Sequence, residues 1–342
     1  MIEFSETRIT NLILHKVSIE PGNCRVNDSE YDLSESDEEN TLKKIFLKPF
    51  TAAAATYEFS HEINLELNPL YKLSTAISDN EDFIGTSKNI YQHLKSVSKH
   101  PNIKDGDLFI IKYRNLKMNN KFYDGLGIYK VENKENFVET NITDKGEFRL
   151  TFKKGIGSRK LDKACLILFT EIPYTVLIID NAPVETDYWM NEFIRAGLKN
   201  DNINNTNHFL TLAKSYITGQ MPEEYNVPKT TQIDLLNRSV EYFKNHETFE
   251  KEEFENEIFH DNGIIDSFRK FDETYREEND LKSLENFVIS TQAVKKQAKI
   301  FKSVLKLDRN FHIYIHGDRE LIEQGIDQDG RKFYKIYYQE EL

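Results

Sequence analysis

Cysteine is scarce in this sequence, with only Cys24 and Cys165, which lie far apart. Two such residues cannot build the disulfide framework of a secreted domain or a thiolate metal cluster, and this indicates a reducing compartment. No run reaches the ~20 apolar residues that a membrane-spanning helix needs. The start, MIEFSETRIT, lacks the basic and apolar regions of a secretion signal. We therefore expect a cytoplasmic protein that does not contact a membrane.

Sequence motifs for catalysis are missing as well. HEINLE (61–66) begins like a zinc-protease helix, but Leu65 stands where the second histidine is required. KKGIGSRK (153–160) lacks the spacing and the final Lys-Ser/Thr of a P-loop. No Ser-His-Asp or Cys-His arrangement follows from the spacing of these residue types. We expect no enzyme activity, no metal site and no cofactor.

One catalytic alternative has a concrete form, that of a metal-dependent nuclease. Glu132-Asn133-Lys134 has the acid-x-lysine order of such enzymes, and Asp107 and Asp124 offer further carboxylates to hold Mg²⁺. A second triplet of this kind occurs at Asp280-Leu281-Lys282, so chance alone produces the pattern in this chain. The nuclease is the weakest of the readings.

What the chain does contain is enough apolar sequence for one large core or two ordinary ones. It has 342 residues, of which 39% are hydrophobic and 12% aromatic, so two domains are expected. Strand-like runs dominate the first half, and in the stretch 83–97 the apolar residues share one helical face. Helical patterns dominate after Pro183, and three short strand-like runs close the chain. We predict an α+β fold with an N-terminal domain over 1–183 and a C-terminal helical domain over 184–342, which ends in a small antiparallel β-meander.

The segment 293–317 is basic, although the formal net charge of the chain is −12. On a helix at 100° per residue, four lysines fall within about 60° of one another. They are Lys295, Lys299, Lys302 and Lys306. Apolar residues occupy much of the opposite side, and Ser290 or Thr291 is placed to cap the start. The pattern predicts an amphipathic helix with a lysine ridge roughly 16 Å long. Such a ridge matches several phosphates of duplex DNA.

Two readings of this ridge stay open. An amphipathic helix needs a polar face, and lysine is a common way to supply one. The stretch 241–285 holds fifteen acids against six bases, and it offers carboxylates to pair with the lysines. The net charge does not exclude a polyanion, because salt screens charges over about 8 Å.

Several long strings resemble a bacterial nucleoid-associated protein family, the NdpA/YejK-like one, in its Bacteroidetes-type branch. They are LDKACLIL (161–168), YWMNEFI (188–194), IDLLNRSVEYFKNHETF (233–249) and the whole of 293–317. The resemblance is strong from about residue 155 onward and thinner before it. It implies a cytoplasmic protein located at the nucleoid that binds DNA and interacts with type II topoisomerases. It assigns no role to individual residues.

Our leading hypothesis is a non-enzymatic protein that binds DNA largely without sequence specificity. The candidate contacts are Lys295, Lys296, Lys299, Lys302, Lys306 and Arg309. A weaker, secondary phosphate contact is predicted at Lys153, Lys154, Arg159 and Lys160. The alternative is an acidic adaptor that docks on a DNA enzyme such as a type II topoisomerase through 28–40 and 241–285.

Overall fold

The computed structural model describes residues 2–33, 35–157, 160–181, 188–279, 284–300, 304–314 and 321–340; the side chains of 299, 300 and 304–306 lie outside the description. The chain divides into two compact units, Met1–Lys199 and Asn200–Leu342, each of which is described by itself. Helices and mostly antiparallel strands occur in both units, which confirms the α+β class.

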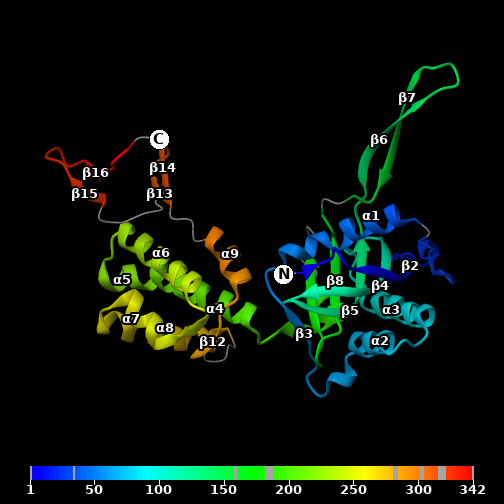
Figure 1. The fold of residues 1–342 in the computed structure, drawn as a ribbon, viewed down its shortest axis with the longest axis horizontal. Helices are drawn as coiled ribbons and strands as arrows, with labels where there is room; N and C mark the ends of the chain where they lie inside the picture. Colours follow the sequence, from blue (N-terminus) through cyan, green and yellow to red (C-terminus); the bar gives the residue numbers. More distant parts are fainter. Residues whose placement is uncertain are drawn as a thin grey trace. The chain divides into compact units, whose positions relative to one another are not determined.

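An antiparallel sheet forms the centre of the first unit (Figure 1). Its strands are β1 (Ile2–Glu3), β2 (Arg8–Val17), β3 (Tyr57–Phe59), β4 (Gly106–Met118), β5 (Lys121–Val131), β8 (Lys163–Leu168), β9 (Thr175–Asp180) and β10 (Ala196–Leu198). The order along the sheet is β1-β4-β5-β8-β9-β3-β10, and β2 also pairs with β4. The strand-like runs at 107–113, 125–131, 164–169 and 175–180 are therefore confirmed as strands.

Alternate residues of the central strands point to opposite faces of the sheet, and each face is covered by helices. Ile110 and Ile128 belong to one core, which also contains residues of α2 (Pro69–Ser78) and α3 (Phe83–Val97). Ile111 and Tyr129 belong to the other core, together with residues at the end of α1 (Ser36–Phe46). These strands read as nearly continuous apolar runs because both faces are buried.

The segment 188–194 belongs to the first unit. It forms a π-helical turn, Tyr188–Ile194, and Trp189 and Phe193 are fully buried in the same core as α2 and α3. The chain therefore divides after Lys199, beyond the boundary expected near residue 183. The helical pattern that begins after Pro183 predicts a boundary there, but the aromatic side chains of this turn pack in the core beside the sheet.

Helices around an aromatic core make up the second unit. They are α4 (Asn202–Ser215), a π-helical continuation (Tyr216–Gln220), α5 (Met221–Tyr225), α6 (Lys229–Asn245), α7 (Lys251–Phe259), α8 (Asn262–Glu278) and α9 (Thr291–Ile300). Phe209 lies at the centre of this core, with its ring 4.1 Å from that of Phe249 and 5.0 Å from that of Phe254. A short pair of strands, β11 (Thr248–Glu250) and β12 (Asn286–Val288), ties the start of α7 to the approach to α9.

The described strands at the end of the chain form two separate hairpins instead of the expected β-meander. One joins β13 (Val304–Leu307) to β14 (Phe311–Tyr314), and the other joins β15 (Ile322–Ile326) to β16 (Lys332–Ile336). Gly330, with a φ of +80°, lies in the turn of the second hairpin, where the sequence DQDG predicts one. Among the described residues, no helix is both long and apolar enough to span a membrane.

Candidate nucleic-acid interface

Helix α9 carries the first two candidate lysines. Ser290 caps its start, since its Oγ accepts a hydrogen bond of 3.3 Å from the N–H of Ala293. Ala293 and Val294 are buried against the core of the second unit. Lys295 lies on the exposed side and has no ion pair within the described part of the chain. The predicted amphipathic helix therefore exists at its N-terminal end, with a free lysine outside.

The predicted ridge does not continue along one helix, because α9 ends at Ile300. Lys306, expected on that ridge, lies in strand β13 opposite His312 of β14. Asp308, with a φ of +53°, begins the turn that reverses the chain, and Arg309 lies exposed in this turn. The run VLKL (304–307) fits a strand as well as a helix, and pairing with Phe311–Tyr314 decides for the strand. Lys302 and the side chains of Lys299 and Lys306 lie outside the described part.

Lys296 differs from its neighbour. Its side chain is half-buried, and this burial lowers the pKa of the Lys296 ammonium group below its usual value. It also has an interaction within the chain, so it is not a free cation. Of the two lysines at the start of α9, Lys295 is the better placed to meet an external phosphate.

Some acids of the stretch 241–285, with Asp272 and Glu255 among them, form ion pairs with bases of the same stretch. Asp272 accepts from Lys251 at 2.6 Å and from Arg276 at 2.9 Å, and Arg269 binds the Glu255 carboxylate at 2.6 Å. Asp272 and Glu255 are buried, so these pairs hold α7 and α8 together. The alternative in which this stretch neutralises the lysine segment gains no support at Lys295.

The secondary basic group is divided between a hairpin and the loop after it. Lys153 and Lys154 lie in β7 (Phe148–Gly155), which pairs with β6 (Glu135–Ile142), and Lys153 forms an ion pair of 2.5 Å with Glu139. Lys160 is exposed, and Arg159 lies outside the described residues. If Gly157 carried a side chain, its Cβ would lie 2.7 Å from a carboxylate oxygen of Glu135. The Glu135 carboxylate therefore lies beside the glycine loop.

The carboxylates of the nuclease alternative are not assembled into one site. Asp107 lies opposite Val131 at one end of the β4–β5 strand pair, while Asp124 lies well along the pair, next to Gly125, which is opposite Tyr113. Six residue steps along the strands separate these two positions, which is roughly 20 Å at ~3.4 Å per residue. Lys134 binds Asp107 at 2.6 Å. Within the described ranges, no cluster of His, Cys, Asp or Glu is arranged to hold a metal ion.

Sequence reasoning missed a buried polar cluster at the ends of β5 and β8. The Lys130 ammonium group donates to Glu132 at 2.7 Å, to the carbonyl of Lys104 at 2.6 Å and to the Tyr188 hydroxyl at 3.2 Å. Lys163 binds Asp180 at 2.7 Å, and its Nζ lies 4.9 Å from the centre of the Tyr188 ring. Burial is the main cause that lowers the pKa of Lys130 and raises that of Tyr188. Lysines inside otherwise apolar strands were the available signal.

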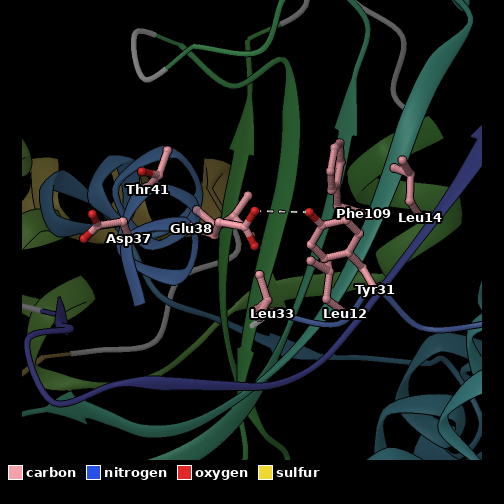
Figure 2. Close-up of a pocket in the computed structure, with 9 residues that line it drawn as sticks. Leu12, Leu14, Tyr31, Leu33, Asp37, Glu38, Thr41 and Phe109 are labelled. Carbon is pink, nitrogen blue, oxygen red and sulfur yellow. Dashed lines mark hydrogen bonds between the residues drawn. The ribbon is translucent and has the colours of Figure 1, made fainter. Parts of the chain in front are cut away.

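A pocket of about 490 Å³ opens between α1 and the sheet face formed by β2 and β4 (Figure 2). Leu12, Leu14 and Phe109 line the sheet side, and Figure 2 shows the Glu38 carboxylate and the Tyr31 hydroxyl facing each other. The second carboxylate oxygen of Glu38 is buried and has no hydrogen-bond partner. In the acid-rich segment 28–40, helix α1 begins at Ser36, and Asp37, Glu38 and Glu39 lie in its first turn, where acids stabilise a helix.

The family of the nucleoid-associated protein YejK matches residues 13–339, which is nearly the whole chain. The chain belongs to this family. The match spans both units, including α9 and the terminal hairpins. Comparisons with curated proteins and with solved structures give no match. Membership of the YejK family associates the chain with the nucleoid, as the resemblance in the sequence implied.

Proposed function

We propose that this member of the YejK family is a non-enzymatic nucleoid protein that binds DNA largely without reading its sequence. Family membership is the observation that carries the proposal, because a chain associated with the nucleoid meets DNA as its most abundant polyanion. The contacts proposed are basic side chains at the start of α9 and in the hairpin after it, from Lys295 to Arg309. Lys295 and Arg309 are exposed and have no ion pair among the described residues, which supports this placement.

Affinity for duplex DNA should fall steeply with salt. If about four phosphates are contacted, log affinity changes with log salt at a slope near −4, at ~0.9 per phosphate. Raising the salt from 50 to 200 mM should then weaken binding by about 150- to 250-fold. Fluorescence anisotropy of a labelled 20-base-pair duplex measures this, and a shuffled sequence should give the same curve. A flat salt dependence would contradict phosphate binding.

A charge-reversal pair locates the contact. Lys299→Glu with Lys302→Glu should weaken binding by about tenfold or more on every sequence and make the salt slope shallower by about 2. The control is Lys44→Glu with Lys270→Glu, since both lysines are exposed and the net charge changes by the same amount. Equal losses in the two double variants would remove the lysine segment from the proposal.

A second function is favoured by the pocket beside α1, namely that of an adaptor for a DNA enzyme such as a type II topoisomerase. Among the described residues that line this pocket, the charged ones are Asp37 and Glu38, so the pocket suits a partner segment with both basic and apolar side chains. If the chain is such an adaptor, the purified protein should retard duplex DNA in a gel mobility-shift assay only when the topoisomerase is present. Leu14→Lys should then weaken capture of the enzyme by about tenfold, by placing a cation and a bulkier chain at the pocket.

A further inference from the structure

Strands β6 and β7 form a two-stranded arm, defined as Glu135–Gly155, that leaves the central sheet. The two strands pair only with each other, from Glu135 opposite Gly155 to Ile142 opposite Phe148. Figure 1 shows the arm extending away from the body of the first unit. The strand-like run at 148–154 is a strand, and it pairs outside the central sheet. An isolated two-stranded hairpin is only marginally stable in water.

The arm has two different faces, because residues opposite each other on an antiparallel pair point to the same side. One face carries large apolar side chains that are between 50% and 81% exposed: Val138, Ile142, Phe148, Leu150 and Phe152. The other face carries mostly polar groups, including Glu139, Asn141, Arg149 and Lys153. Lys154, at the base of the arm, is the only charged residue on the apolar face.

The apolar face is large enough to form half of an interface. Its five side chains expose roughly 600 Å² of surface, at about 150–200 Å² for a nearly free phenylalanine. Apolar patches of this size on a soluble protein usually mark a contact with another molecule. Two such faces packed together would remove roughly 1,200 Å² from water, which is the lower end of the range for specific protein interfaces.

The charge of the arm indicates what covers this face. Residues 135–154 contain four acidic and four basic side chains, so the arm is neutral, while the whole chain carries −12. Duplex DNA would require an excess of basic groups, which the arm lacks. Two copies of an acidic protein repel each other least where each is neutral. A twofold interface, moreover, brings the same patch together with itself, and an apolar face is complementary to itself.

We propose that the apolar faces of two arms pack against each other and make this protein a homodimer. The two hairpins then form a small sandwich, with sheets about 10 Å apart and the side chains of Ile142, Phe148 and Phe152 between them. Packing in the dimer supplies the stabilisation that a single hairpin lacks. This inference does not depend on DNA binding, and it is tested in the absence of DNA.

Sedimentation equilibrium of the full chain over about 1–100 µM tests the proposal. The wild type should sediment with twice the 40.2 kDa mass of the chain. Ile142→Glu and Phe148→Glu should each weaken the dimer by about a hundredfold, because each places a charge in an apolar interface and does so twice per dimer. Fluorescence of Trp189, the single tryptophan and fully buried in the first unit, should stay unchanged in both variants and show that the unit is folded.

The matched control is Asn141→Glu. It adds the same charge to the adjacent position of the same strand, but on the polar face, opposite Arg149. This variant should dimerise like the wild type. A monomeric wild type at 100 µM would overturn the proposal. So would a dimer that survives both Ile142→Glu and Phe148→Glu, or one that Asn141→Glu weakens to the same extent.

Discussion

Replacing Glu132 with alanine should lower the free energy of unfolding of the first unit by about 3–5 kcal/mol, the usual cost of breaking a buried ion pair from one side. The side chains of Lys130 and Glu132 are 0% and 4% exposed, so Lys130 would remain as a buried charge without its counter-ion. The carbonyl of Lys104 and the Tyr188 hydroxyl still accept hydrogen bonds from the Lys130 ammonium group, but neither carries a negative charge. Urea unfolding followed by Trp189 fluorescence measures the loss in this unit.

The size of this loss should depend on pH. In Glu132→Ala, Lys130 can lose its proton and so avoid being an unpaired buried charge. At pH 7 this deprotonation costs at most about 5 kcal/mol, because the normal pKa of lysine is near 10.4. The cost falls as the pH rises. The gap between wild type and Glu132→Ala should therefore narrow between pH 7 and 9. The control is Lys134→Ala, which breaks the exposed pair with Asp107 and should cost no more than about 1 kcal/mol. Equal losses in the two variants would show that the buried pair has no special role.

Acidification should destabilise the first unit through His15. This residue is buried; its Nδ1 accepts from the N–H of Asn27 at 3.2 Å, so the proton is on Nε2, which donates to Ser87 Oγ at 3.1 Å. Burial, with a smaller contribution from Lys88, lowers the pKa of His15 from 6.5 to about 4; nearby Asp28 acts in the opposite direction. A proton on Nδ1 would break the bond from Asn27. The folded state therefore disfavours the charged imidazole.

The sign of the effect follows from this lowered pKa. Below pH 6.5 the unfolded chain binds a proton at this position, while the folded chain does so only near pH 4. The contribution of His15 is complete above pH 6.5 and is lost as the pH falls to about 4, by at most about 3 kcal/mol at ~1.4 per pH unit. His15→Gln lacks this titration, so its stability gap to the wild type should close between pH 6.5 and 4. Parallel pH profiles of the two proteins would contradict the role of His15.

The α+β class and most elements of the first unit follow from residue periodicity alone. Continuous apolar runs such as DLFIIKY and ACLILF are strands because strands buried on both faces need no polar alternation. The stretch 83–97 is a helix with Phe83, Ile90 and Leu94 buried on one face, as its spacing predicts. These predictions depend on neighbours only a few residues apart.

The lysine segment shows where such local reasoning fails. One half of it is a helix, as predicted, but at 304–307 the alternation of Val, Leu and Lys satisfies two periods at once. Pairing with the strand Phe311–Tyr314 makes this segment a strand instead of a helix. The chain reverses between the two strands in a turn that begins at Asp308. The outward position of Lys295 could be read from the sequence. The half-buried state of Lys296 could not, because it depends on what packs beside α9.

By itself, the sequence determined the fold class, the strands and helices with clear periods, and the membership of the YejK family. Only the tertiary structure decided that Lys130 and Glu132 are buried partners, that β6 and β7 leave the sheet as an arm, and that segment 188–194 belongs to the first unit. The physical reason is range. Periodicity records which side of an element avoids water, whereas pairing and burial depend on residues distant in the chain that folding brings together.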